Sequence, residues 1–218
     1  MHRINRLYRK RKTSAEIIVD LGVREVVLHN DVYLTLGIGV GDYVSEEQLA
    51  QWEGRDATAR CRRKAWDLLG ARPRSTAELQ KSLLRRFSPA TVQQVLKELT
   101  AQKHLNDAQF TELYAEQLDR KGTGPRVIQQ KLKQKGLPEP LIAEALAHVR
   151  AEQKEENRPA ELLAVWLRKQ RPTTTREEQF KLKNRAVQFL ARKGFEFDAI
   201  RQAVEAGIGE LPENDIYE

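Results

Sequence analysis

The stretch GPRVIQQKLKQKGLPEPLIAEAL (residues 124–146) decides the fold of this chain. Apolar residues recur in it at helical spacing, first at Ile128 and Leu132 and then at Ile142 and the leucine four positions later. Gly136 stands between the two runs, where a helix commonly ends in the left-handed conformation, and a proline follows two residues on. The stretch therefore predicts two short amphipathic helices joined by a tight turn.

The same arrangement occurs three times along the chain. Leu83, Leu132 and Leu190 occupy equivalent positions, separated by 49 and then 58 residues. The third copy therefore contains about nine inserted residues, and the polar run Arg171–Thr175 marks the place. Repeats of about 50 residues are supersecondary units that bury their apolar faces against their neighbours. Such chains usually present an extended surface to a long partner, which favours a binding protein over an enzyme.

Helix start and stop signals divide each copy into three helices. Ser75 with Glu78 forms a capping-box pattern, and Ser88 precedes Pro89 as a helix cap would. After a lead-in helix beginning at Ser45, we expect helices near 57–70, 75–87, 89–101, 106–120, 124–135, 138–150, 159–170, 179–194 and 196–206. The predicted fold class is all-α, with three tandem three-helix repeats that form an elongated curved solenoid.

The first 45 residues have a different character. Residues 1–13 carry many cations and few apolar groups, which is typical of a mobile basic arm. Three β-prone runs follow at 16–19, 26–28 and 32–36, and His29-Asn30-Asp31 suits a tight turn between the last two, so we expect a small β-hairpin with a third strand as an option. The expected segments are an arm (1–14), a hairpin module (15–45), a lead-in helix with repeat 1 (46–104), repeat 2 (105–150), repeat 3 (151–207) and an acidic tail (208–218).

Composition limits the class of protein without fixing it. The chain has 38 Lys and Arg against 31 Asp and Glu, a net charge of +7. That balance is compatible with nucleic acid, with an acidic protein surface, or merely with solubility. A single cysteine, Cys61, excludes an internal disulfide and is best interpreted as a small core residue. With no long apolar run and no apolar signal core, we expect a soluble, cytoplasmic protein without a membrane partner.

We find no pattern that predicts catalysis. The four histidines are scattered and match no metal-ligand spacing. Gly37, Gly39 and Gly41 lack the following helix, lysine and hydroxyl residue of a phosphate-binding loop, so chain reversal is the preferred role. We therefore expect no enzyme, no cofactor and no metal.

Aromatic residues and clustered cations remain as candidates for a binding surface. We interpret the aromatic residues as core rather than as platforms for stacked bases, for Trp66, Phe110, Tyr114, Trp166, Phe180 and Phe189. Cations on a helix can neutralise phosphates, can meet an acidic protein groove, or can simply be solvated. The sequence does not separate these alternatives.

The middle repeat and its neighbours also resemble a known family. The quoted stretch is preceded by Leu105-Asn106-Asp107 with Phe110 and Tyr114, and by Lys121-Gly122-Thr123 ahead of Gly124. Arg74-Ser75 with Glu78-Leu79 in repeat 1, and Phe189-Leu190 with Gly194-Phe195 in repeat 3, add to the pattern. Over about residues 57–206 the chain resembles the RecX family, the regulators of the RecA recombinase. Repeat 1 departs from the pattern because it lacks the glycine before Phe87, so its second helix must end differently.

The resemblance implies a non-enzymatic negative regulator that binds the RecA–single-stranded DNA filament. Such a protein lowers the ATPase of the filament, blocks its extension and suppresses strand exchange, and so modulates recombinational DNA repair and the SOS response. The expected partners are the RecA filament and its single-stranded DNA, met by a monomer. The motif residues themselves are scaffold, so our candidate contact residues rest on charge: Arg72, Arg74, Arg85, Arg86, Arg126, Lys131, Lys133, Lys135, Arg185, Arg192 and Lys193. A DNA-binding helical repeat that acts without the recombinase, and a plain interaction scaffold, are the alternatives.

Overall fold

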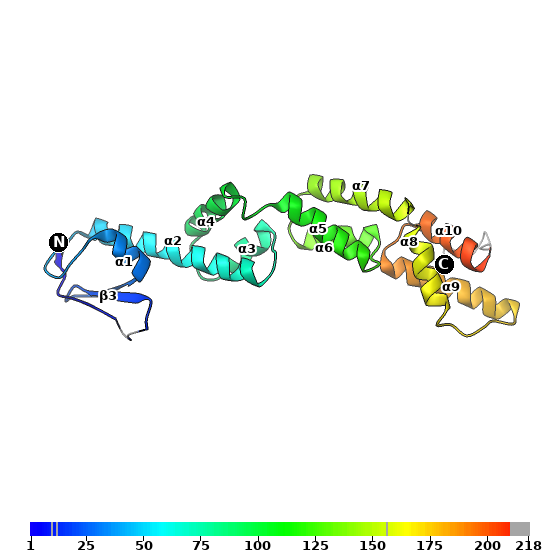
Figure 1. The fold of residues 1–218 in the computed structure, drawn as a ribbon, viewed down its shortest axis with the longest axis horizontal. Helices are drawn as coiled ribbons and strands as arrows, with labels where there is room; N and C mark the ends of the chain where they lie inside the picture. Colours follow the sequence, from blue (N-terminus) through cyan, green and yellow to red (C-terminus); the bar gives the residue numbers. More distant parts are fainter. Residues whose placement is uncertain (10, 12, 156, 210–218) are drawn as a thin grey trace. The chain divides into compact units, whose positions relative to one another are not determined.

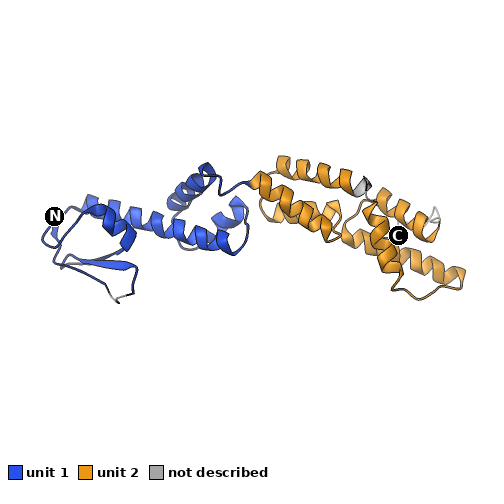
Figure 2. Cartoon of the chain, viewed as in Figure 1, with its two compact units in different colours: residues 1–106 blue, residues 107–218 orange. Residues whose placement is uncertain are grey.

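The computed structural model describes residues 1–9, 11, 13–155 and 157–209. The chain divides into two compact units, Met1–Asn106 and the part beginning at Asp107 (Figure 2). Unit 1 contains β1 (His2–Arg3), β2 (Arg6–Tyr8), β3 (Glu16–Asp20), β4 (Glu25–His29), α1 (Asn30–Leu36), β5 (Tyr43–Val44), α2 (Glu46–Ala71), α3 (Thr76–Leu83) and α4 (Pro89–Ala101). Unit 2 contains α5 (Asp107–Arg120), α6 (Pro125–Gln134), α7 (Glu139–Glu155), α8 (Arg158–Leu167), α9 (Arg176–Lys193) and α10 (Phe197–Ile208).

Unit 1 begins with a small strand module. β2, β3 and β4 form an antiparallel sheet in that order, and β1 pairs separately with β5. Side chains from one face of the sheet pack with Leu49 and Trp52 of α2 in a common core. Strands β3 and β4 lie on two of the predicted β-prone runs, 16–19 and 26–28, but these two strands pair with each other, whereas the sequence placed the hairpin between 26–28 and 32–36.

Three predictions for this module were wrong. The arm is not free, because Ile4 is fully buried in the module core and its N–H donates to the carbonyl of Asp42 at 2.8 Å. The chain between β3 and β4 turns at Leu21–Arg24, where Gly22 has φ +80°, and not at His29-Asn30-Asp31. The run at 32–36, expected as a strand of the hairpin, is helix α1, which His29 precedes as N-cap and Gly37 ends in the left-handed conformation.

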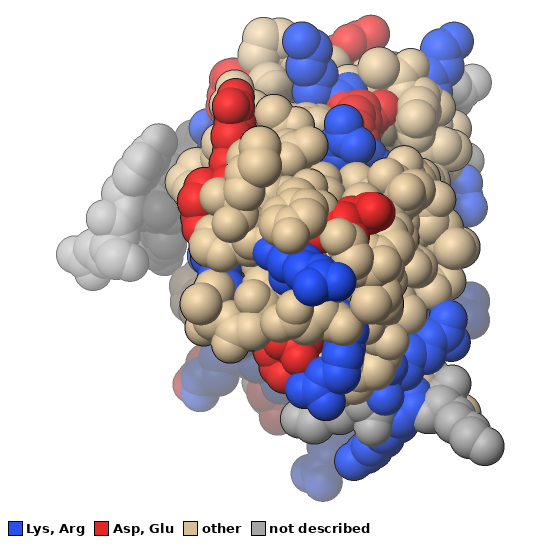
Figure 3. All heavy atoms as spheres, turned by 90° about the vertical axis from the view of Figure 1, so that its left-hand side faces the viewer, with Lys and Arg blue, Asp and Glu red and all other residues tan. Residues whose placement is uncertain are grey.

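The surface of this module is chemically mixed. Large exposed apolar side chains are concentrated in it, and they are Met1, Tyr8, Val23, Val27, Leu34, Val40 and Tyr43. The space-filling view onto the N-terminal end shows cations and acids interspersed among uncharged residues (Figure 3).

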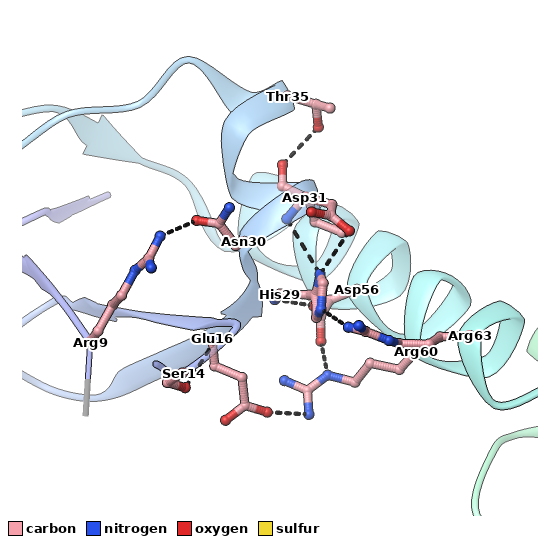
Figure 4. Close-up of polar contacts among 11 residues, drawn as sticks. Arg9, Ser14, Glu16, His29, Asn30, Asp31, Thr35, Asp56, Arg60 and Arg63 are labelled. Atoms are coloured by element: carbon pink, nitrogen blue, oxygen red, sulfur yellow. Dashed lines mark hydrogen bonds and ion pairs between the residues drawn. The ribbon is translucent and has the colours of Figure 1, made fainter. Parts of the chain in front are cut away.

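A polar network ties the module to α2 (Figure 4). The buried carboxylate of Asp56 accepts the backbone N–H of His29, and it also pairs with Arg60, which reaches Glu16 at 3.0 Å. Nε2 of His29 lies 2.5 Å from a guanidinium nitrogen of Arg63. Nδ1 of His29 accepts the backbone N–H of Asp31 at 3.3 Å, which caps α1. The network fixes where the sheet meets the helix.

Helix α2 continues from the strand module into repeat 1 without a break (Figure 1). We expected a lead-in helix followed by a separate helix near 57–70, but residues 46–71 have no proline or turn residue that would end a helix inside them, and Gly54 is tolerated. Ser45 caps the helix with Gln48 in a full capping box. The remaining repeat helices lie where the sequence predicted them, within a few residues.

Each repeat closes around its own apolar cluster. In repeat 1, Leu79 and Leu83 are fully buried against α2 and α4. The fully buried equivalents are Ile128 and Leu132 in repeat 2 and Leu190 in repeat 3. Cys61 is buried in the first cluster, and burial raises the pKa of its thiol, so it stays protonated. The curved, elongated arrangement of the three repeats stays a prediction.

Two of the six aromatic residues do not belong to the core. Trp66 is 41% exposed and meets His104 edge to face, with ring centroids 4.5 Å apart. Phe180 is 36% exposed on α9. The other four are partly buried and pack on the clusters, as predicted, and two of them, Trp166 and Phe189, stack at 5.5 Å. The acidic tail lies outside the described residues from residue 210 onward.

Candidate functional site

The first two candidate cations hold a turn. Arg72 follows α2 and places its guanidinium against the carboxylate of Glu78 through two contacts of 3.0 and 3.2 Å. Arg74 is half-buried and donates from Nε to the carbonyl of Leu68 at 3.0 Å. Both side chains therefore stabilise the α2–α3 turn, which leaves them less available to a partner than their charge suggested.

Arg85 and Arg86 are more accessible. They lie in the tight turn after α3, where the backbone N–H of Arg86 bonds to the carbonyl of Leu83 at 3.0 Å. Both side chains are exposed, and neither has an ion-pair partner in the part of the chain that the structure describes. Leu84 beside them is 43% exposed. This turn is an accessible basic site of unit 1.

The cations of α6 differ from one another. Arg126 is exposed in the first turn of the helix, without an ion pair to any described residue. Lys133 reaches Glu139 at 3.2 Å, and the ammonium of Lys135 lies 5.5 Å from the ring centre of Tyr114. Lys131 is half-buried. The Lys133–Glu139 pair is at the surface, so it contributes little to stability and leaves the charge usable, whereas Lys135 is half-buried beside Tyr114.

A backbone junction brings α6 and α9 together. The N–H of Gly124 donates to the carbonyl of Lys193 at 2.7 Å, and the N–H of Arg126 donates to the carbonyl of Gly194 at 3.0 Å. The unpaired N–H groups at the start of α6 are thus satisfied by carbonyls at the end of α9, where the helix dipoles also complement each other. Of the candidate residues, Arg126 and Lys193 therefore contribute backbone groups to this junction, and Arg192 precedes Lys193 in the last turn of α9.

Gly124 is required at this junction because of space. A Cβ on Gly124 would lie 2.3 Å from the carbonyl carbon of Gly194 and 2.3 Å from the backbone nitrogen of Phe195. Gly194 itself has φ +91° and ends α9 in the left-handed conformation. The glycines that the sequence assigned to turns therefore also let two repeats approach backbone to backbone.

Arg185 lies apart from the junction, more than one turn earlier on α9. It lines a cavity of about 550 Å³ with Arg171 and Lys181, beside the α8–α9 loop. Sequence reasoning selected Arg185 but missed Arg168, Lys169, Arg171 and Arg176 nearby. A local charge count would have found them, because residues 168–185 hold seven cations and only two acids, Glu177 and Glu178. A single basic face that runs across all three repeats stays a prediction.

Other classes of site have no counterpart in the described residues. Across residues 1–9, 11, 13–155 and 157–209, no three His, Cys, Asp or Glu side chains lie close enough to share a metal ion. None of the described helices combines the length and apolar character needed to cross a membrane.

Comparisons with known proteins agree with the repeat structure. Models of the first, second and third three-helix domains of RecX match residues 61–99, 106–146 and 156–204. Regulatory protein RecX of Bacillus subtilis is 31% identical over 178 residues, which cover 80% of this chain and 65% of that protein. The chain thus spans slightly less than two thirds of this relative. Regulatory protein RecX of Corynebacterium efficiens is 30% identical over 165 residues, covering 73% of this chain and 79% of that protein.

Solved structures agree in fold. A crystal structure of regulatory protein RecX aligns with a TM-score of 0.64 and 22% identity, covering 94% of this chain and all of that one. RecX from Lactobacillus salivarius aligns with a TM-score of 0.57 and 20% identity, covering 70% of this chain and 97% of that one. The three matched domains follow in order along the sequence, and each coincides with one of the three-helix repeats. This chain belongs to the RecX family.

Proposed function

We propose that this chain is a negative regulator of the RecA recombinase. It binds the RecA filament on single-stranded DNA and inhibits its ATPase, its extension and strand exchange, and thereby modulates recombinational repair and the SOS response. Membership of a family whose relatives are named regulatory proteins carries this proposal. Accessible cations in each of the three repeats, at the α3–α4 turn, at the α6–α9 junction and on α9, support it.

The proposed action is binding without chemistry. Exposed guanidinium groups such as those of Arg86 and Arg126 can pair with carboxylates of a protein surface or with phosphates of bound DNA. A partner that repeats along its length would meet a repeated set of such groups. Many weak contacts of this kind add up when they are held in one molecule, which suits a filament better than a small ligand. The chain acts as a monomer in this proposal.

The first experiment measures ATP hydrolysis by RecA on single-stranded DNA while this protein is titrated. Loss of hydrolysis well below one molecule per recombinase would argue for blocking of filament ends. Loss only near equal amounts would argue for lining of the filament groove. No loss at any ratio would contradict the proposal.

A variant pair tests the basic surface. Lys133→Glu with Lys135→Glu should raise the half-inhibiting concentration about tenfold or more, because two attractive charges become repulsive. Its fold should persist, since the Lys133–Glu139 pair is exposed and Lys135 is only half-buried beside Tyr114. Arg55→Glu with Lys97→Glu is the matched control, because both are exposed cations of unit 1 and the change in net charge is the same. Unchanged inhibition by the Lys133/Lys135 variant would remove these two lysines from the interface.

The second candidate function is a DNA-binding helical repeat that acts without the recombinase. The cations around the α8–α9 loop favour it as an additional capacity. Salt distinguishes the two functions. Direct binding to naked DNA weakens steeply as salt rises, whereas the regulator requires the recombinase filament.

A further inference from the structure

We infer that the cavity beside the α8–α9 loop is a binding site for the phosphate groups of a polynucleotide. The inference rests on the second candidate function, direct binding to DNA, for which it names the site, and it does not depend on the proposed regulation of RecA. It concerns residues that the three-repeat pattern does not require. The site is defined by Arg171, Thr173, Lys181, Asn184 and Arg185, which line the cavity of about 550 Å³.

The loop is longer than repeat packing needs. The corresponding turns in repeats 1 and 2 are residues 72–75 and 121–124, four residues each, whereas the α8–α9 connection is residues 168–175, eight residues. The core of repeat 3 closes around Leu163, Leu190 and Ile200 without an apolar residue from this loop. The extra residues are instead cationic and polar, which is typical of a segment that serves binding rather than packing.

The cations of the cavity are available. Arg171 and Arg185 have no ion-pair or hydrogen-bond partner among residues 1–9, 11, 13–155 and 157–209, and both are exposed. Lys181 pairs with Glu177, which lies outside the lining, at 2.6 Å. Two guanidinium groups and an ammonium beside a hydroxyl and an amide are the donors that phosphate oxygens prefer.

One acid, Glu178, also lines the cavity, but its carboxylate is occupied. It accepts the backbone N–H groups of Thr174 at 2.9 Å and Thr175 at 3.2 Å, and these bonds lower its pKa. The lining therefore carries three cations against one acid, a net charge of +2. The loop is held in place by the carboxylate, while the guanidinium groups remain free to bind an anion.

A neighbouring aromatic residue indicates a polymer rather than a free phosphate ion. Phe180 precedes Lys181 on α9, one turn before Asn184, and is 36% exposed. An exposed ring beside phosphate-binding cations is the arrangement by which proteins hold single strands, with the base stacked on the ring. Arg168, Lys169 and Arg176 extend the cationic surface along the loop, all of them exposed.

The test measures binding of the full chain to a fluorescein-labelled dT20 oligonucleotide by anisotropy, without recombinase, at several salt concentrations. Arg171→Glu with Arg185→Glu should weaken binding about tenfold or more near 0.1 M salt, and should lower the slope of log affinity against log salt by about 1.4 or more, since each lost phosphate contact on a single strand contributes about 0.7. The control pair Arg55→Glu with Lys97→Glu makes the same change in net charge in unit 1 and should change affinity by less than about threefold.

Three outcomes would overturn the inference. The first is an unchanged affinity for dT20, and the second is an equal loss of affinity in both variant pairs. The third is inorganic phosphate that binds at the cavity without displacing dT20. If the Glu variant shows altered circular dichroism or a lowered melting temperature, Arg171→Gln with Arg185→Gln replaces it, with an expected loss of slope near 1.4. Because RecA is absent, failure here leaves the regulator proposal intact, and failure of the ATPase experiment leaves this one intact.

Discussion

Repeats 2 and 3 share a core and differ in the turn between their first two helices. Leu132 and Leu190 are fully buried at equivalent positions, and Gly136 and Gly194 follow four residues later, both with positive φ. The turn before α6 is four residues long, contains Gly122 and Gly124, and packs closely against repeat 3. The turn before α9 is twice as long and cationic.

This difference teaches how a repeat can acquire a new property. Buried positions are constrained because a change of even one methylene group alters packing. A turn that no neighbour packs against is free to lengthen at little thermodynamic cost. The turn of repeat 2 contacts repeat 3 through its backbone, whereas the cations in the longer turn of repeat 3 are exposed.

The shared core predicts that equivalent core substitutions in repeats 2 and 3 cause large and equal losses of folding stability. Leu132→Ala and Leu190→Ala should each lower the free energy of unfolding by about 3–4 kcal/mol, because each removes a fully buried side chain and leaves a cavity. Urea denaturation followed by circular dichroism measures both. If one variant lost less than a third of what the other loses, the two positions would not be equivalent.

The close backbone contact of Gly124 predicts a smaller loss of folding stability that is specific to repeat 2. Gly124→Ala should cost about 2–3 kcal/mol, because its Cβ would lie 2.3 Å from backbone atoms of Gly194 and Phe195, which cannot move like a flexible side chain. Gly54→Ala, inside α2 with nothing within 4 Å of the new Cβ, should stabilise by about 0.5–1 kcal/mol. A stable Gly124→Ala variant would mean that the two repeats do not meet through their backbones.

The sequence predicted the repeat helices because helical spacing, caps and glycine stops all indicate the same boundaries there. α6, for example, starts at Pro125 and is followed by Gly136 with φ +70°, as its pattern required. Repeat 1 also ends its second helix differently, since α3 stops at Leu83 and a tight turn replaces the missing glycine.

The strand module was predicted only in part because charge concealed its pattern. The arginines around Ile4 and Leu7 indicated a free arm, yet those two apolar side chains are what attach the arm to the core. The run at 32–36 is β-prone locally but becomes helix α1 because His29 caps it and because Tyr33 and Leu36 pack against the module core. Tertiary packing overrides local propensity in such short elements.

The candidate site shows the same limit of sequence reasoning. Charge selected the cations correctly as surface groups in most cases, but it could not tell a structural cation from a free one. Arg74 is engaged with the carbonyl of Leu68, a backbone acceptor that no sequence pattern announces. Arg171 is exposed without an ion pair to any residue that the structure describes, and only its place in the inserted loop distinguishes it.

The smallest expected effect is a difference in acid sensitivity between the two turns. α9 starts with a capping box in which Glu178 accepts the N–H groups of Thr174 and Thr175, and these bonds hold its pKa below its ordinary value of 4.5. A carboxyl group whose pKa is lower in the folded state stabilises the fold above its unfolded pKa, and this stabilisation is lost as pH falls through the lowered value. α6 starts at Gly124 without a side-chain cap, because its N–H groups bond to carbonyls at the end of α9, which do not titrate.

Amide hydrogen exchange followed by NMR should therefore show that the amides of Thr174 and Thr175 lose protection below about pH 4.5, while the amide of Arg126 keeps its protection. Glu178→Gln should make the first two amides insensitive to pH in that range, and an equal response of both turns in the parent protein would mean that the carboxylate does not hold the loop.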